Sequence, residues 1–297
     1  MIYVMMFTKH FRFLKADIFS NEIRRLCSKI STYKELNDGT VVVEKVGEVT
    51  TIGINRPEKR NCINSSTSRF LEIAIENFEN DSRSYVGIIH GIGGNFCSGE
   101  DLEEIANQSS PKTSSMDFSH KIRTKPLVAA VSGYAVGGGL NIVLMCDLTV
   151  LEENALLGFY NRRFGLPCSK RQTHRLAATV GLSRALDLIL TGRTLTAEEA
   201  FQWGLANRIV ACGTALGQAL QLARSLVKFP QQCLLHDRNI LYESVFNINL
   251  HDENTNPSTV FHEESTHGAQ KFVQMGIGKH GKSYNLKKKH IPDWEKE

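Results

Sequence analysis

Two glycine-rich segments hold the residues of this sequence that are best suited to chemistry. The first spans residues 91–102 and contains Ser98 and Gly99, and the second spans 133–139 and ends in three consecutive glycines. Glycine lets the backbone approach a ligand closely and adopt positive φ. A helix that begins at such a turn presents unpaired N–H groups with partial positive charge. Two such turns facing each other would form an oxyanion hole; the alternative is a pair of tight strand-to-helix turns that bind nothing.

Hydrophobic patterning predicts the elements that position both segments. Buried strands are predicted at 86–90 and 127–131, one before each segment, and an apolar helix at 140–146 follows the second. Further strands are predicted at 40–46, 49–54, 148–151 and 155–157, and further helices at 66–78, 173–180, 183–190, 197–204 and 214–229. Strands that alternate with helices, followed by a helical C-terminal third, indicate an α/β body with a helical appendage.

The composition limits the class of protein. The chain has 297 residues, of which 41% are hydrophobic and 22% charged, so a sizeable core is expected. No apolar run approaches the ~20 residues of a membrane-spanning helix. Seven cysteines without a CxxC pair predict reduced thiols in an intracellular compartment. The same spacing argues against a metal site.

The positive charge is concentrated at the N-terminus. Residues 1–34 hold seven basic and two acidic side chains, whereas the other 263 residues hold 28 basic and 29 acidic ones. The nearly neutral body argues against nucleic acid as a partner. A basic, acid-poor N-terminus is typical of a mitochondrial transit peptide. We therefore expect a mitochondrial protein, with a plain N-terminal extension on a cytoplasmic protein as the alternative.

Several motifs, taken in order, resemble the crotonase superfamily, which contains the enoyl-CoA hydratases and isomerases. They are Asn55-Arg56-Pro57, Phe96-Cys97-Ser98-Gly99-Glu100-Asp101-Leu102, Lys125-Pro126-Leu127-Val128-Ala129-Ala130-Val131, Gly133-Tyr134-Ala135-Val136-Gly137-Gly138-Gly139, Leu190-Thr191-Gly192-Arg193 and Trp203-Gly204-Leu205-Ala206-Asn207. The resemblance extends from about residue 40 to about residue 282.

The resemblance implies a fold and an assembly. The fold would be an α/β spiral of ββα turns with a C-terminal helical region that mediates trimerisation. The domains would be a basic extension (1–34), a core that binds acyl-CoA (40–225), the helical region (226–282) and a basic tail (283–297). A homotrimer or a dimer of trimers would be the assembly. The ligand would be an acyl-CoA thioester, so CoA would enter with the substrate and no separate cofactor is expected.

The resemblance also assigns binding residues. The backbone N–H groups of Ser98 and Gly138 would hold the thioester oxygen and stabilise an enolate. The CoA moiety would lie along the segment from Arg56 to Cys62 and along the loop Ser98-Gly99-Glu100-Asp101. Phe272 and Lys279 of a neighbouring subunit would reach the CoA.

The catalytic acids depart from the family pattern. Hydratases of the family carry one glutamate two positions after the third glycine and another three positions after the glycine of the following strand. Here these positions are Asn141 and Asn161. An amide neither gives nor takes a proton near pH 7. Each lost acid or base typically costs ~10²–10⁴ in rate.

Six other side chains have chemistry that would suit the site. Glu100 and Asp101 are interpreted as carboxylates that cap a helix, with a role as catalytic acids as the alternative. His90 is interpreted as a packed histidine, Cys97 as a small apolar filler, and Tyr160 as a pocket wall or proton donor. An arginine at 162 or 163 facing the pocket would suit an anionic acyl group.

Three functions therefore stay open. The protein is a hydratase or isomerase with an unrecognised acid, an acyl-CoA decarboxylase in which loss of CO₂ generates the enolate, or a non-catalytic CoA-binding protein. The amides at Asn141 and Asn161 favour the last two. The two glycine-rich segments favour the two enzymes.

Overall fold

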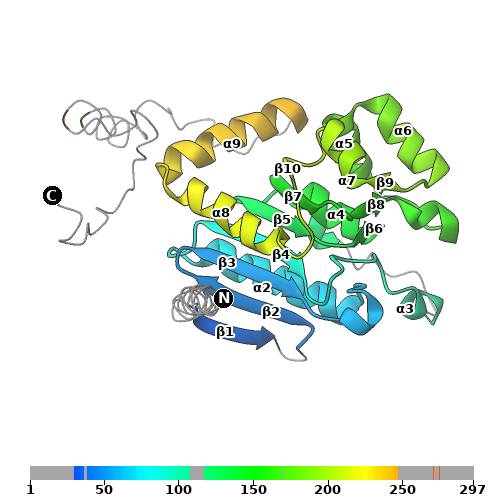
Figure 1. The fold of residues 1–297 in the computed structure, drawn as a ribbon, viewed down its shortest axis with the longest axis horizontal. Helices are drawn as coiled ribbons and strands as arrows, with labels where there is room; N and C mark the ends of the chain where they lie inside the picture. The colour runs from blue at the N-terminus through cyan, green and yellow to red at the C-terminus, as the bar shows by residue number, and fades with distance from the viewer. Residues whose placement is uncertain are drawn as a thin grey trace, which may run out of the picture.

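A seven-stranded sheet forms the centre of the molecule (Figure 1). The computed structural model describes residues 30–36, 39–107, 117–168 and 170–246, together with positions 270 and 274. In spatial order the strands are β1 (Ile30–Leu36), β2 (Val41–Val46), β3 (Val49–Ile54), β4 (Val86–Gly91), β5 (Leu127–Val131), β7 (Leu148–Glu152) and β10 (Arg208–Val210). β1 to β3 pair antiparallel, and every pair from β3 to β10 is parallel.

The parallel strands are apolar on both faces because helices cover both. In β5, Val128 and Ala130 pack toward α8 (Ala215–Val227), whereas Leu127, Ala129 and Val131 join the other core cluster. This alternation is the period of two that a strand imposes on its side chains. Side chains of α2 (Ser65–Asn80) and α4 (Gly138–Met145) complete this other cluster, which contains Leu127, Ala129 and Val131.

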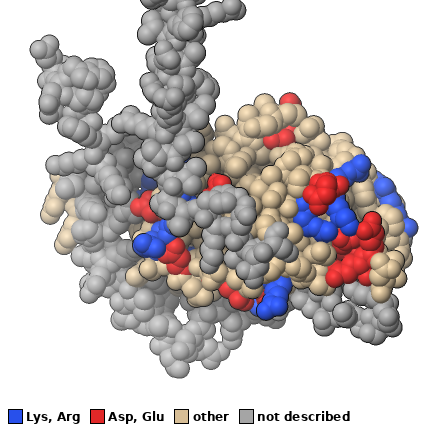
Figure 2. Space-filling view, turned by 90° about the horizontal axis from the view of Figure 1, so that it is seen from below, with Lys and Arg blue, Asp and Glu red and all other residues tan. Residues whose placement is uncertain are grey.

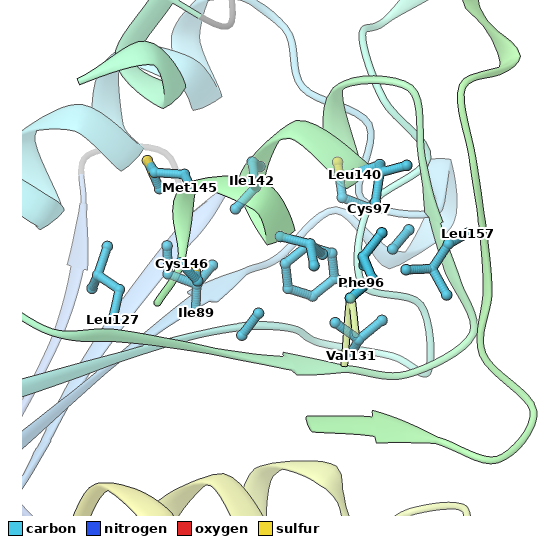
Figure 3. Packing of buried hydrophobic residues seen from close by; sticks show 14 of the residues in the cluster. Ile89, Phe96, Cys97, Leu127, Val131, Leu140, Ile142, Met145, Cys146 and Leu157 are labelled. Carbon is cyan, nitrogen blue, oxygen red and sulfur yellow. The ribbon is translucent and has the colours of Figure 1, made fainter. Parts of the chain in front are cut away.

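The core beneath α4 is densely packed around Phe96, which is fully buried. Figure 3 shows Phe96, a residue of the first glycine-rich segment, near Val131 and Leu140. The buried ring of Phe96 therefore anchors this segment to the core.

A smaller sheet and the remaining helices complete the fold. The smaller sheet has the order β6 (Tyr134–Val136), β8 (Leu156–Gly158) and β9 (Leu195–Thr196). The other helices are α3 (Leu102–Ala106), α5 (Lys170–Val180), α6 (Leu182–Thr191), α7 (Ala197–Gln202) and α9 (Gln231–Phe246), with 3₁₀ turns η1 (Pro57–Lys59), η2 (Asp117–His120) and η3 (Tyr160–Phe164).

The C-terminal helix α9 is held to the body by the carboxylate of Asp147. This carboxylate accepts hydrogen bonds from Arg238 Nε at 2.7 Å and Tyr242 OH at 2.8 Å. Its other oxygen accepts from the Leu127 N–H at 2.8 Å, at the start of β5. In the part of the chain that the structure describes, no helix is long and apolar enough to cross a membrane.

The predicted α/β body is confirmed, and the long elements lie where the patterning placed them. Four strands were missed: β1, β6, β9 and β10. β1 overlaps the end of the predicted extension at 1–34 and pairs with β2 as an edge strand. Residues 1–29, the tail 283–297, Phe272 and Lys279 lie outside the described residues, as does the side chain of Arg162.

Candidate active site

A pocket of about 590 Å³ opens where the two glycine-rich segments meet. Four stretches line it: 58–62, 98–103, the turn between β6 and α4, and 160–166. These stretches come from parts of the sequence that are a hundred residues apart, and the sheet brings them to one side of the molecule. A pocket of this size falls within the range of small-molecule sites.

Backbone hydrogen bonds join the two glycine-rich segments. The N–H of Cys97 donates to the Tyr134 carbonyl at 2.8 Å, and the N–H of Val136 donates to the Cys97 carbonyl at 3.1 Å. Glycine is required at the contact. A Cβ on Gly99, which has φ +99°, would lie 3.2 Å from the Gly138 nitrogen, and a Cβ on Gly139 would overlap the Cys97 carbonyl. The predicted convergence of the segments is therefore present.

The two predicted oxyanion donors have different surroundings. Gly138 is the first residue of α4, and its N–H acts to lower the pKa of the nearby Glu100 carboxyl group. The N–H of Ser98 donates to the Arg60 carbonyl at 3.0 Å. The expectation that both N–H groups point freely at one point therefore needs correction: Arg60 C=O accepts from the second donor, because the 59–61 backbone folds back over it.

A buried asparagine that the sequence analysis did not single out holds that backbone. Arg60 and Asn61 have φ of 50° and 58°, in the left-handed region that residues other than glycine rarely adopt. Asn61 Nδ2 donates to the carbonyls of Ile92 at 2.9 Å and Asn95 at 2.6 Å, and its Oδ1 accepts from the Arg56 N–H at 2.8 Å. These bonds stabilise an otherwise strained turn at the pocket edge.

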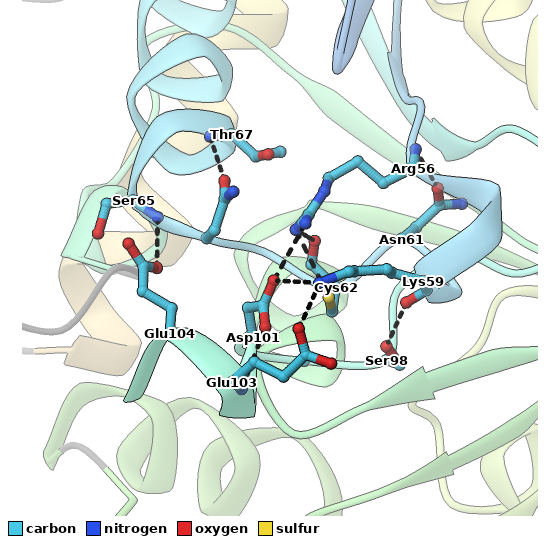
Figure 4. Close-up of polar contacts among 12 residues, drawn as sticks. Arg56, Lys59, Asn61, Cys62, Ser65, Thr67, Ser98, Asp101, Glu103 and Glu104 are labelled. Carbon is cyan, nitrogen blue, oxygen red and sulfur yellow. Dashed lines mark hydrogen bonds and ion pairs between the residues drawn. The ribbon is translucent and has the colours of Figure 1, made fainter. Parts of the chain in front are cut away.

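Arg56 and Asp101 form an ion pair beside the pocket (Figure 4). Arg56 Nη2 lies 3.0 Å from Asp101 Oδ2, and its Nη1 donates to the Cys62 carbonyl at 2.7 Å. Asp101 is also the N-cap of α3, since Oδ1 accepts from the Glu103 N–H at 3.2 Å. Arg56 is buried and does not line the pocket. Its contacts assign it to positioning the loop.

The two amides that replace the expected glutamates are buried. Asn141 is 2% exposed and Asn161 5% exposed. Among the described residues, the Asn141 amide has no hydrogen-bond partner for its Nδ2 or for its Oδ1. Within the same part of the chain, the Oδ1 of Asn161 has none either. Asn161 lines the pocket, whereas Asn141 lies in α4, three residues after Gly138, and is not among the lining residues. A buried polar group without a partner is costly and points to a role in binding.

Glu100 and Asp101 are neighbours with opposite environments. Burial raises the pKa of Glu100, although the nearby N–H groups of Glu100 itself and of Gly138 act to lower it. Burial also acts to raise the pKa of Asp101, but the hydrogen bond from Arg56 and the charge of Lys59 outweigh it and lower that pKa. The capping interpretation is thus confirmed for Asp101 at α3. Glu100 instead faces the N-terminus of α4.

The remaining candidates divide between the pocket and the core. Tyr160 and Arg163 line the pocket; the Arg163 guanidinium lies 3.7 Å from the Tyr160 ring centre and donates to the Gly192 carbonyl at 3.0 Å. His90 packs against Gly53, outside the pocket, and burial lowers its pKa. Burial raises the pKa of the Cys97 thiol to about 12 and that of Cys62 to about 11. Both cysteines are therefore protonated thiols.

The sequence of this chain matches the family model described as enoyl-CoA hydratase/isomerase over residues 44–280. The chain belongs to the enoyl-CoA hydratase/isomerase family. The predicted crotonase fold is thereby confirmed, and the pocket lies where this family's two glycine-rich segments meet.

Known proteins agree with this assignment. The chain is 33% identical over 197 residues to mevalonyl-coenzyme A hydratase of Aspergillus fumigatus, covering 63% of this chain and 72% of the relative. It is 32% identical to a probable mitochondrial enoyl-CoA hydratase of Dictyostelium discoideum, covering 65% and 71%. A crystal structure of enoyl-CoA hydratase from Mycobacterium tuberculosis superposes with a TM-score of 0.67 at 31% identity, covering 79% of this chain and 95% of that one.

Proposed function

We propose that this protein binds an acyl-CoA thioester in the pocket and stabilises its enolate with the backbone N–H of Gly138. The observation that supports this most is the turn at the start of α4, where Gly137 lines the pocket with a positive φ and a Cβ on Gly139 would overlap the Cys97 carbonyl. The charge of a developing enolate oxygen would be stabilised by this N–H and by the helix N-terminus. One such donor is typically worth about 2.7–4 kcal/mol.

Binding changes the contacts of both predicted donors. The thioester oxygen would take a place beside the Gly138 N–H, near the Glu100 carboxylate, and Ser98 would serve as second donor only if the Arg60 carbonyl releases its N–H. The Lys59 ammonium and the Arg60 guanidinium belong to the stretch of the pocket edge where the phosphates of CoA are expected. Their positive charge suits that end of the ligand.

Two other functions are tested against this one. Decarboxylation is favoured by Arg163, a cation in the pocket wall that would hold a second carboxylate of the acyl group. A non-catalytic CoA-binding protein is favoured by the buried amides at Asn141 and Asn161.

A panel of CoA thioesters separates these functions. The purified protein is incubated with crotonyl-, butyryl-, malonyl- and methylmalonyl-CoA, and binding and product masses are followed. A hydratase adds 18 mass units to crotonyl-CoA, a decarboxylase removes 44 from the malonyl thioesters, and a binding protein changes none. Absence of binding to every thioester would refute the proposal.

Gly138→Pro tests the backbone donor. Proline is tolerated at the first position of a helix but has no N–H, so the fold of α4 is expected to persist while the donor is lost. We expect turnover of any active thioester to fall about 10²–10³-fold. Circular dichroism checks the fold, and unchanged turnover would remove Gly138 from the mechanism.

We further propose that the protein assembles as a homotrimer or a dimer of trimers and resides in mitochondria. The family resemblance supports the assembly, and the basic N-terminus supports the location. Light scattering of the full chain gives the mass of the assembly.

A further inference from the structure

Two backbone hydrogen bonds with Ile63, one on each side of Glu100 in the chain, hold Glu100 in place. The Ile63 N–H donates to the Gly99 carbonyl at 2.7 Å, and the Asp101 N–H donates to the Ile63 carbonyl at 2.9 Å. Glu100 is thus the central residue of a parallel bridge with Ile63. Neighbouring side chains in extended backbone point to opposite sides. Because Asp101 points at Arg56, the side chain of Glu100 points the other way, into the pocket.

The carboxylate of Glu100 lies at the start of α4. Its Oε2 lies 3.9 Å from the point where a Cβ on Gly137 would be, and the Gly138 N–H acts to lower the pKa of this carboxyl group. The Asn161 Oδ1 lies 3.5 Å from that same point. The carboxylate therefore lies beside the turn where the proposed function places the thioester oxygen, next to a buried amide.

Glu100 differs from the other carboxylates that line the pocket. Asp101 is paired with Arg56, and Glu103 is paired with Lys59 and has a side chain 79% exposed. Glu58 is exposed on η1. Among the described residues, no Lys or Arg forms an ion pair with Glu100, although it is only partly accessible. A partly buried carboxyl without a cation is suited to exchange protons.

We propose that Glu100 is the catalytic base and acid of this site and that it transfers protons at Cα of the bound thioester. This rests on the proposed function, because the thioester oxygen must bind the Gly138 N–H, beside which the Glu100 carboxylate lies. The carboxylate is then next to Cα, one bond from the carbonyl carbon. Glu100 thereby supplies the chemistry that Asn141 and Asn161 lack.

The step balances with one carboxyl group. The ionised carboxylate takes a proton from Cα, the C–H electron pair forms the Cα–C double bond, and the carbonyl electrons move onto the oxygen held by Gly138. The resulting carboxylic acid returns a proton to Cα, or to Cγ where the acyl chain has a 3,4 double bond. The first outcome exchanges the α-proton with solvent, and the second converts a 3-enoyl into a 2-enoyl thioester.

Deuterium exchange tests the proposal without requiring a net reaction. Butyryl-CoA is incubated with the protein in D₂O, and the mass of the thioester is followed. We expect the wild type to add up to two deuterons and Glu100→Gln to slow exchange by about 10²–10⁴-fold. Glu100→Asp keeps an ionisable group and should give an intermediate rate. Glu104→Gln is the matched control, because Glu104 lies on α3, outside the pocket, and its amide can still accept from the Ser65 N–H.

Binding of butyryl-CoA, measured by calorimetry, separates two kinds of failure. If the wild type does not bind, the proposed function fails and this proposal fails with it. If it binds but exchanges no deuterium, or if Glu100→Gln exchanges as fast as wild type, the role of Glu100 is refuted while thioester binding stands. Binding by Glu100→Gln at wild-type affinity or tighter, with exchange lost, supports the proposal.

Discussion

At the scale of single residues, the pocket contains two adjacent carboxyl groups with different duties. Asp101 is ionised, paired with Arg56 and caps α3, so its side chain builds the loop. Glu100 has no cation partner among the described residues and lies against the N-terminus of α4. Pairs of groups whose environments move their pKa values apart are typical of acid and base assignments in enzymes.

The raised pKa of Glu100 has a consequence for stability. The folded protein holds this proton more tightly than the unfolded chain, in which the pKa is near 4.5. The stability linked to this group is therefore fully present below that pH and is lost as the pH rises through the folded pKa. Other titratable and charged groups lining the pocket are Glu58, Lys59, Arg60, Cys62, Asp101, Glu103, Tyr134, Tyr160 and Arg163.

Glu100→Gln should therefore be more stable than the wild type at about pH 7, and the two proteins should be equally stable at about pH 4. The amide keeps the shape of the side chain and never ionises, whereas the other pocket groups titrate in both proteins and cancel. We therefore expect the thermal midpoint of the variant to exceed that of the wild type at neutral pH, and the difference to disappear at acidic pH. A variant that is less stable at neutral pH would show that the ionised carboxylate stabilises the fold.

Residues of the site were predictable to different degrees. The meeting of the two glycine-rich segments follows from sequence, because glycine at Gly99 and Gly139 serves a close backbone approach. The engagement of Ser98 by Arg60 C=O does not, since it depends on left-handed conformations at Arg60 and Asn61 that only the surrounding carbonyls enforce. Asn61 was missed for the same reason.

At the scale of elements, length decided what could be predicted. The strands β4 and β5 and the helices α2 and α8 have enough periodic residues to be identified from sequence. The strands β6, β9 and β10 have three, two and three residues, too few to show a pattern. β1 is longer, but it lies at the edge of a basic segment that was interpreted as a targeting sequence.

Two glycine-to-alanine changes, one at the junction of the two glycine-rich segments and one in α8, should have opposite effects on stability. Gly139→Ala places a Cβ against the Cys97 carbonyl and should destabilise the protein by about 1–3 kcal/mol. Gly217 lies in α8 with no atom within 4 Å of its would-be Cβ, so Gly217→Ala should stabilise by roughly 0.5–1 kcal/mol. Urea unfolding of both variants checks this, and equal effects would mean that the junction is not tightly packed.

At the scale of the whole molecule, charge is distributed so that the body is neutral and the N-terminus basic. On the face shown in Figure 2, acidic and basic side chains lie in mixed groups. The edge strand of the sheet overlaps the end of the basic segment 1–34, since β1 begins at Ile30 and pairs with β2. Import and folding should therefore depend on different parts of the N-terminal region, separated at about this residue.

Two truncations test that separation. Removing residues 1–29 deletes six of the seven basic side chains of the segment 1–34 and leaves β1 intact. We expect a fluorescent fusion of this variant to lose mitochondrial localisation while the thermal midpoint of the purified protein changes by no more than about 2 °C. Removing residues 1–38 also deletes β1 and exposes the backbone N–H and C=O groups of β2 as a new sheet edge. That variant should unfold at a lower temperature and aggregate. Continued import of the shorter truncation would refute the targeting role, and equal stability of the two truncations would show that β1 adds nothing to the fold.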